Sequence, residues 1–459
     1  MRRLSLFLIA SIVAAQEPAS LTARAQRYLV DLIRINTTNP PGNETRVAEY
    51  LKRAATANGI SAELLGDNPA RLNFVARLPA TAHSGARPLL LMAHSDVVPA
   101  DRSQWTVDPF SAELRDGYVY GRGAQDDKSL LAAELAVLVE LKRRGVELKR
   151  DVILLSESDE EAGSTGINWL VRNAYGKIDA EFALNEGGAA LDVRSGTRLF
   201  QIQTTEKVPT RVILTAKGTA GHASLPRPDN PVVHLARAIA RLADLGEPVQ
   251  LNTTTRRYFS ELSKLPDYAW LAPLAPRLEH ESTAGGAAGE IEVRDPELNS
   301  MLRTSATPTM LSAGLKVNVI PNQAVAQVDV RRLPSETRQE IETRFRNAIN
   351  DPAVTVSREP GQEMPATEPS SLTTPLFLAM EKVFHQANPN ALVVPYMSRG
   401  ATDGSYLRQK GMAVYGVPIF VREGESRAHG NDERISPENL AAGTELLWKI
   451  VSAVAAPVP

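Results

Sequence analysis

A histidine and an aspartate, two residue types that serve divalent metals, follow the apolar run at residues 89–93. His94 ends this run, and Asp96 lies two residues later. Because side chains on a strand alternate between its faces, His94 and Asp96 are expected to point the same way. A carboxylate beside a histidine can accept one ring N–H and leave the other nitrogen free for a metal. This spacing also arises by chance, so a metal site requires further ligands elsewhere in the chain.

Four more motifs place acids or a histidine after separate segments. Asp126 stands in GRGAQDDK before a helix pattern, and Glu160 and Glu161 stand in ESDEEAG after the run DVILLS. Glu186 stands in NEGG after FAL, and His429 stands in the polar stretch RAHGNDER. Taken singly, each of these residues could equally well be a helix cap, an acid in a turn or a surface side chain. Their shared position after apolar strands is better explained by one site, because the carboxyl ends of parallel strands meet at one edge of a sheet.

The residue types restrict the metal chemistry. The chain has no cysteine, so a metal must be bound by histidine and carboxylate, and thiol catalysis is excluded. Two histidines with several carboxylates suit zinc or a similar divalent cation. A metal pair needs a bridging carboxylate, and an unligated carboxylate can act as a base toward a metal-bridging water. The pattern therefore indicates a two-metal hydrolytic site.

The elements that would position these residues alternate between strand and helix. Strand patterns at 73–78, 88–93 and 151–156, with a helix pattern at 129–144, predict an α/β fold with a mainly parallel sheet. From about residue 201 the pattern changes to an α+β unit. Within that unit, residues 250–310 are rich in Pro, Thr and Ala, and we expect them to be irregular.

We predict one catalytic α/β domain split by an inserted α+β lid and dimerisation domain. The expected divisions are a signal peptide at 1–15, the first part of the catalytic domain at 19–204, the inserted domain at 205–360 and the second part of the catalytic domain at 361–459.

The N-terminus is typical of an exported protein. Two arginines precede the apolar residues 4–15, and small residues lead to an expected cut after Ala15. The apolar run is too short to span a bilayer comfortably, although an uncleaved anchor is the alternative. We expect a periplasmic or secreted protein with no membrane attachment after cleavage.

The overall composition is that of an ordinary globular protein of 459 residues, large enough for two or three domains. The formal net charge of −2 gives no support to a nucleic-acid partner. No G-x-S-x-G motif is present, which disfavours a serine hydrolase.

The ordered set HSD, GRGAxDxK, DEExG, NEGG and a late histidine resembles the co-catalytic zinc metallopeptidase family of aminoacylase, glutamate carboxypeptidase, carboxypeptidase S and acetylornithine deacetylase. The likeness covers residues from about 21 to 450. It implies two Zn²⁺ ions, or another divalent metal such as Co²⁺, and a cis peptide between Asp126 and Asp127. By this resemblance the first metal is bound by His94, Asp126 and Glu186, and the second by Asp126, Glu161 and His429. The resemblance also makes Glu160 the general base and Asp96 the support of His94.

The same resemblance assigns residues to the inserted domain. His222, in GHAS, would reach the substrate's oxyanion across a homodimer. Asn318 and Arg331 would bind the substrate's free carboxylate, with Arg332 turned away by strand alternation. Gly400, in RGATDG, would line the substrate pocket, although Ala401 stands where the family has a second glycine.

These residues together predict a hydrolase that cleaves the amide bond of N-acyl amino acids or short peptides next to a free carboxylate. Two alternatives stay open. One is a deacetylase or aminopeptidase specialised for a single metabolite. The other is a metal-bearing binding or dimerisation module without catalysis, which the presence of Asp126, Glu160 and Glu161 disfavours.

Overall fold

The computed structural model describes residues 20–82, 84–358 and 363–457, so the expected signal peptide lies outside the described residues. A central mixed sheet has the strand order β1-β2-β6-β3-β7-β17-β9-β16, with β8 paired to β9. The adjacent pairs β6–β3, β3–β7, β7–β17 and β9–β16 are parallel. Its strands are β1 (Ser61–Leu65), β2 (Asn73–Leu78), β3 (Leu89–His94), β6 (Val152–Glu157), β7 (Phe182–Asn185), β8 (Ala189–Asp192), β9 (Arg198–Glu206), β16 (Leu392–Ser398) and β17 (Ala413–Gly416).

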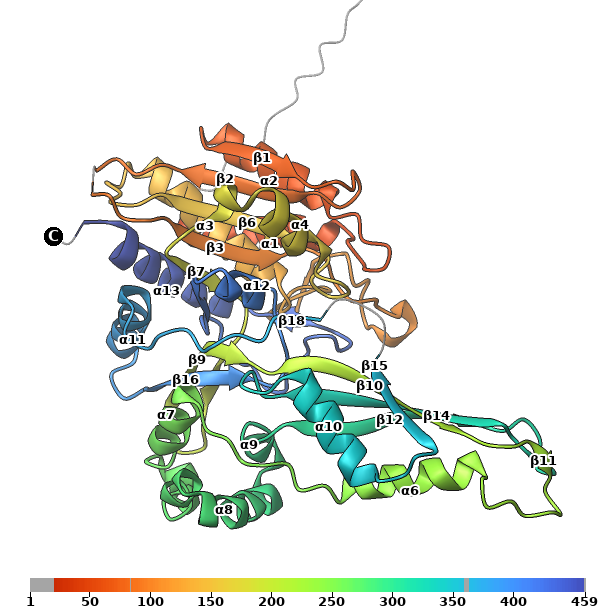
Figure 1. Cartoon of the computed structure of the whole chain (residues 1–459). Coiled ribbons are helices and arrows are strands. Elements are labelled where there is room, and N and C mark those ends of the chain that lie inside the picture. The colour runs from red at the N-terminus through yellow and green to blue at the C-terminus, as the bar shows by residue number, and fades with distance from the viewer. Residues whose placement is uncertain (1–19, 83, 359–362, 458–459) are drawn as a thin grey trace, which may run out of the picture.

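Helices cover both faces of this sheet (Figure 1). Every residue of β3 is buried, as expected for a strand packed on both sides. Leu89 and Leu91 pack with one helical layer, and Leu90 and Met92 pack with the other. The first layer contains α1 (Leu21–Arg34), α2 (Thr45–Ala57), α3 (Lys128–Arg143), α11 (Pro375–Ala387) and α13 (Pro437–Ala455), and the second contains α4 (Thr165–Asn173), α5 (Tyr175–Ile178) and α12 (Gly404–Gln409).

A second sheet forms the unit that we call the lid. Its antiparallel order is β12-β14-β10-β15, and one face packs on two helices. Figure 1 shows the lid extending away from the central sheet, with the short β11–β13 pair at its far tip. Its elements are β10 (Val208–Lys217), β11 (Gly221–His222), α6 (Pro231–Ala243), β12 (Ser305–Ala313), β13 (Val319–Ile320), β14 (Gln323–Arg332), α10 (Arg338–Ile349) and β15 (Val354–Arg358).

The expectation of an irregular segment at 250–310 is wrong. The segment contains the helices α7 (Thr253–Leu262), α8 (Glu281–Arg294) and α9 (Pro296–Ser300), and β12 begins at Ser305. Glycines inside α8 weaken its sequence pattern, but Ala287, Ala288 and Ile291 are buried and stabilise it through tertiary packing. These helices pack on Leu199, Val394 and Met397 of the central sheet.

The short strands β4 (Glu113–Arg115), β5 (Tyr118–Tyr120) and β18 (Arg434–Ile435) form a third sheet, which pairs residues near 120 with residues near 434. Among the described residues, no helix is both long enough and apolar enough to cross a bilayer.

Candidate metal centre

The structure brings together the ends of three strands and two loops at one edge of the central sheet. His94 is the last residue of β3, Glu186 follows β7, and Glu161 lies four residues after β6. Asp126 stands just before α3, and His429 lies in the loop before β18. All five residues that the sequence marked as metal ligands therefore meet, although they are spread over more than 300 positions.

Their side chains form two groups that share Asp126. In the first, ligand atoms of His94, Asp126 and Glu186 all lie within 4.8 Å of one another, and in the second the same holds for Asp126, Glu161 and His429. The two carboxylate oxygens of Asp126 face different partners. Oδ1 lies 3.0 Å from Nε2 of His94, whereas Oδ2 lies 3.1 Å from Nε2 of His429. A carboxylate held in this way can bridge two cations.

The electrostatics of the two groups show opposite charges held close together. Burial alone would lower the pKa of His94, but the hydrogen bond to Asp126 and the nearby carboxylate of Asp96 raise it well above its usual value. Hydrogen bonds to Asp126 and Glu161 raise the pKa of His429 to about 10. Burial would raise the pKa of Asp126, but its hydrogen bonds to His429 and His94 lower it.

For Glu160 and Glu186 the charge of His94 lowers the pKa, but burial outweighs it. Burial, followed by the charge of Glu186, raises the pKa of Glu160 well above its usual value. Burial also raises the pKa of Glu186, and the charge of Asp126 adds to the effect. The site is thus an excess of partly buried carboxylates around two imidazoles, a donor set that fits divalent cations.

The group that accepts a hydrogen bond from Nδ1 of His94 differs from the one that the sequence predicted. The nearer acceptor for Nδ1 of His94 is the main-chain carbonyl of Asp96, at 3.0 Å, whereas the Asp96 carboxylate is 3.6 Å away. That carboxylate instead accepts the main-chain N–H groups of Glu160 at 3.1 Å and Glu161 at 3.2 Å, and the side-chain amide of Asn39 at 2.7 Å. Asp96 therefore fixes the segment that carries Glu160 and Glu161. The peptide between Asp126 and Asp127 is cis, as the resemblance implies.

Sequence reasoning missed Glu433 and Arg122. Glu433 is fully buried, and its Oε2 lies 2.6 Å from the guanidinium of Arg122. Its Oε1 accepts the main-chain N–H groups of Gln125 and Asp126, at 2.7 and 3.0 Å. The only signal in the sequence is that Glu433 stands in the polar stretch that contains His429, and that stretch is easily taken for a solvated loop.

The lid residues lie at two separate places. His222 pairs with Val319 in the β11–β13 ladder, and the carbonyl of the adjacent Asn318 accepts the N–H of Ala223, so His222 and Asn318 share the lid tip. Arg331 lies at the other end of β14, where its Nε donates to Asp329 at 2.8 Å. Within one chain, Asn318 and Arg331 are therefore not brought together.

Arg332 is buried and turned away from the Arg331 side of β14, as strand alternation predicted. Gly400 is exposed, and an added Cβ would meet only Oγ of Ser398 at 3.6 Å, so space alone does not demand glycine there. The same loop reaches the central sheet through Thr402. Its hydroxyl donates to buried Glu206 at 3.0 Å and accepts from Asn185 at 3.3 Å.

Comparisons with known proteins agree with this arrangement. N-fatty-acyl-amino acid synthase/hydrolase PM20D1 of Xenopus tropicalis is 31% identical over 76% of this chain and 69% of its own length. Human aminoacylase-1 is 25% identical over 92% of this chain and 93% of its own length.

Among solved structures, the M20 family metallo-carboxypeptidase Sso-CP2 of Sulfolobus solfataricus shares the fold. Its TM-score is 0.71 at 22% identity, over 94% of this chain and 98% of that chain. The family model described as peptidase family M20/M25/M40 matches residues 90–453, which include every residue of the two ligand groups. The chain therefore belongs to peptidase family M20/M25/M40.

Proposed function

We propose that this chain is a two-metal amidohydrolase that cleaves N-acyl amino acids or short peptides at the amide bond next to a free carboxylate. The observation that carries the proposal is the pair of ligand groups joined by Asp126, with Glu160 beside them. The relatives support the substrate class, because two of them are named as an aminoacylase and as an N-fatty-acyl-amino acid synthase/hydrolase.

The metal assignment follows the two groups. One cation is held by His94, Asp126 and Glu186, and the other by Asp126, Glu161 and His429. Nitrogen and oxygen ligands without thiolates suit Zn²⁺, and they also accept Co²⁺. When bound, two such cations would lower the pKa of the attacking water and polarise the scissile carbonyl.

Glu160 is the proposed general base. It is not a member of either ligand group, so its carboxylate is left to accept a proton. It takes a proton from the attacking water and returns it to the nitrogen of the leaving amine. Asp96 positions Glu160 through its main-chain N–H.

The lid supplies the contacts to the rest of the substrate. We assign the free carboxylate to Arg331 and Asn318, and the oxyanion to His222, with Gly400 lining the pocket. A forked guanidinium suits a carboxylate, and in this structure the guanidinium of Arg331 donates two hydrogen bonds to the carboxylate of Asp329, at 2.8 and 3.2 Å. Because His222 and Asn318 share the lid tip, both would serve the site of a second chain.

A homodimer through the lid supplies that second chain. β12 is an edge strand on which Met310 is 61% and Leu311 is 68% exposed, and α6 exposes Val232 and Val233. An unpaired edge with apolar side chains is a surface that pairs with another chain. We retain the division at 19–204, 205–360 and 361–459, with 205–360 as the inserted domain, and we propose export through residues 1–15.

The test of the function is a hydrolysis screen on metal-loaded and chelated protein, with N-acyl amino acids, dipeptides and the matching carboxamides. We expect turnover of substrates with a free carboxylate, its loss after chelation and its return with Zn²⁺ or Co²⁺. Turnover that survives complete metal removal, or an absence of turnover on every substrate by protein with both metals bound, would refute the proposal. Activity on one acyl group alone would favour the specialised deacetylase.

A further inference from the structure

Lys207 is a buried lysine at the point where the chain passes from the central sheet into the lid. It lies between β9, which ends at Glu206, and β10, which begins at Val208, and it is 1% exposed. Its main-chain N–H donates to the carbonyl of Ser398, at the end of the neighbouring β16, at 2.9 Å. The backbone of Lys207 is therefore held by the edge of the central sheet, and its side chain is enclosed by protein.

The side chain of Lys207 extends to a second strand of the lid. Its Nζ donates to the carbonyls of Ser300 and Arg303, both at 2.8 Å, and to Oγ of Ser305 at 3.3 Å. Ser305 is the first residue of β12, the strand by which the chain re-enters the lid sheet. An ammonium group has three N–H donors, and each of them has an acceptor here. Lys207 therefore joins the first entry of the chain into the lid to the second.

Arg331 lies between the two strands that Lys207 joins. In the lid sheet, β14 runs between β10 and β12, and Arg331 pairs with Pro209 on one side and Ser305 on the other. Lys207 lies two residues before Pro209 and bonds to Ser305, so it restrains both strands beside β14. The position of the proposed carboxylate-binding residue is therefore tied to the central sheet through one buried side chain.

The charge of Lys207 has no direct counter-charge. Lys207 forms no ion pair with any carboxylate that the structure describes. The charged groups around it come from four segments, and they are Arg331 (paired with Asp329), Arg399 (paired with Glu297), Glu336 and Glu247. Burial, followed by the charge of Arg331, lowers the pKa of Lys207 to about 7. An anion bound beside Arg331 would stabilise the charged form of Lys207, and the charged form would in turn favour the anion.

We propose that Lys207 is a positioning residue that makes the enzyme selective for substrates with a free carboxylate. It acts by fixing the strands on either side of Arg331 and by adding a buried positive charge near it, and a buried charge is screened less than an exposed one. This inference rests on the proposed amidohydrolase function.

The selectivity should depend on pH. Below about pH 7 Lys207 carries its charge and all three donors, whereas the neutral amine that forms above this pH loses the charge and one donor. The substrate's carboxylate, with an ordinary pKa of about 3.5, stays ionised throughout. The preference for a free carboxylate should therefore fall as the pH rises through 7.

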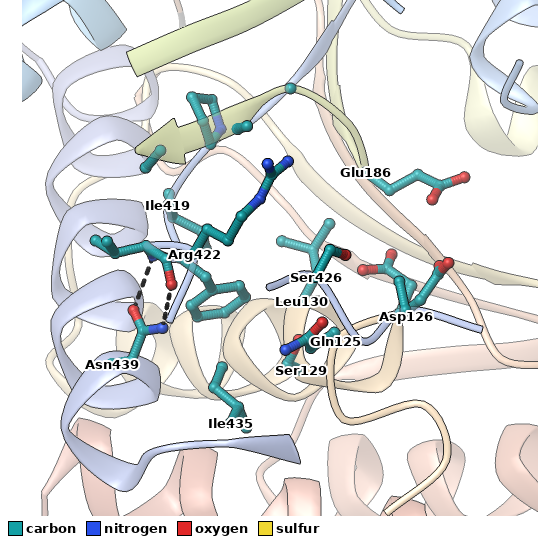
Figure 2. Close-up of a pocket in the computed structure, with 18 of the residues that line it drawn as sticks. Gln125, Asp126, Ser129, Leu130, Glu186, Ile419, Arg422, Ser426, Ile435 and Asn439 are labelled. Carbon is teal, nitrogen blue, oxygen red and sulfur yellow. Dashed lines mark hydrogen bonds between the residues drawn. The ribbon is translucent and has the colours of Figure 1, made fainter. Parts of the chain in front are cut away.

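Arg422 is the competing cation for the same carboxylate. Figure 2 shows it in the wall of a cavity of about 240 Å³ that Asp126 and Glu186 also line. Arg422 is exposed, so water and salt screen its charge, whereas the charge of Lys207 is buried. This difference favours the lid as the place where the carboxylate binds.

The first experiment uses wild-type enzyme with both metals bound. It measures kcat/KM for an N-acyl amino acid and for its carboxamide from about pH 6 to about pH 9. Dividing the first value by the second cancels the titration of every group that acts on the scissile amide. We expect this ratio to fall at least about fivefold with a midpoint near pH 7, because kcat/KM reports the free enzyme. A ratio that does not change with pH would overturn the role of the Lys207 charge.

Variants assign the effect to Lys207. Lys207→Met keeps the length of the side chain without its charge, and the ratio at about pH 6 should fall at least about fivefold, chiefly through KM for the carboxylate substrate. Lys207→Arg keeps a charge that does not titrate, so its ratio should stay constant with pH. Lys217→Met, at the exposed end of β10, is the matched control and should behave as wild type.

The ratio compares two substrates on one protein sample, so a general loss of folded protein does not change it. An unchanged ratio in Lys207→Met, or a wild-type pH dependence in Lys207→Arg, would overturn the assignment. Loss of the preference in Arg422→Ala but not in Lys207→Met would place the carboxylate in the cavity of Figure 2 instead.

An equilibrium measurement separates this inference from the proposed function. Calorimetry on metal-loaded Glu160→Gln protein compares binding of the N-acyl amino acid with binding of its carboxamide, with and without Lys207→Met. We expect the carboxylate to bind more tightly and Lys207→Met to reduce the difference. If wild-type protein hydrolyses no substrate but this difference is found, Lys207 keeps its role and the amidohydrolase assignment falls. If substrates are hydrolysed and neither binding nor turnover depends on Lys207 in this way, this inference falls alone.

Discussion

The carboxylate of Glu433 accepts the main-chain N–H of Asp126 at 3.0 Å, across a sequence separation of 307 residues. It also accepts the N–H of Gln125 and pairs with the buried guanidinium of Arg122. Glu433 lies four residues after His429, so one acid joins the loop of the shared ligand to the loop of a second ligand. We therefore expect both proposed cation sites to depend on Glu433, which belongs to neither ligand group.

Replacing Glu433 should weaken metal binding although it changes none of the proposed metal-ligand residues. Glu433→Gln keeps one acceptor oxygen but presents an NH₂ group to N–H donors and leaves Arg122 without its charge partner. We expect metal affinity to fall about 10- to 100-fold, the usual effect of losing support for a ligand. Competition titration with a chromophoric chelator measures it, and Glu438→Gln on the exposed start of α13 is the control. Equal affinity in the two variants, with both folded by thermal unfolding, would show that Glu433 has no such role.

A substitution at Glu160 should distinguish the role of the proposed base from the role of the proposed metal ligands. Glu160→Gln should lower kcat by about 10²- to 10⁴-fold, the contribution usual for general acid–base catalysis, while both metals stay bound. Glu161→Gln should instead reduce metal content, because Glu161 belongs to a ligand group. Metal analysis together with steady-state kinetics distinguishes the two. Near-normal turnover by Glu160→Gln would remove Glu160 from the reaction.

The proposal that His222 of one chain acts on the site of the other chain can be tested by complementation. Glu160→Ala lacks the base, and His222→Ala lacks the lid histidine, so each homodimer should be inactive. In a mixed dimer, the site that keeps Glu160 receives an intact His222 from the other chain, and activity should return to a fraction of the wild-type value. Co-expression with two different tags isolates the mixed dimer. If it stays as inactive as its parents, His222 does not act on a partner's site.

Replacing Arg331 should impair turnover only of substrates that carry a free carboxylate. Arg331→Ala removes a charge-assisted contact, which contributes about 1.5 to 3 kcal/mol, so KM for a free-carboxylate substrate should rise about 10- to 100-fold. The matching carboxamide lacks that contact and serves as the internal control. A parallel rise for both substrates would point to a structural effect.

Buried Asp403 should make stability depend on pH. Burial raises its pKa to about 8, and neither of its carboxylate oxygens has a hydrogen-bond partner among the described residues. With a folded pKa above the unfolded one, the carboxyl contributes stability below about pH 4, and this contribution is lost as the pH rises toward 8. Asp403→Asn should remove that loss. Between pH 5 and pH 8, the free energy of unfolding of the metal-free variant should therefore fall less than that of the metal-free wild type, by on the order of 1 to 3 kcal/mol. Denaturant unfolding at the two pH values measures it, and an identical pH dependence in both proteins would contradict the assignment.

The strand ends were predictable because the sequence marks them locally. Buried parallel strands such as β3 are continuous apolar runs, and a histidine or an acid directly after one is conspicuous. Three of the five proposed ligands, His94, Glu161 and Glu186, stand out for that reason, and the structure brings all five together.

The support around the ligands was not predictable by the same reasoning. Glu433 contacts main-chain atoms more than 300 residues away, and nothing in the sequence specifies a main-chain partner. The main-chain carbonyl of Asp96, rather than its carboxylate, lies nearest to His94 for the same reason. The helix α8 was missed because its glycines mask the pattern, and only its burial against neighbouring helices accounts for it.

The most direct test of the shared ligand is a metal titration of wild-type and Asp126→Ala protein, both freed of metal and followed by calorimetry with Zn²⁺. Wild-type protein should bind two ions per chain, and Asp126→Ala should lose high-affinity binding at both sites, because each oxygen of Asp126 faces a different histidine. A wild-type stoichiometry of one, or an Asp126→Ala protein that still binds two ions with unchanged affinity, would contradict a pair of cations joined by this carboxylate.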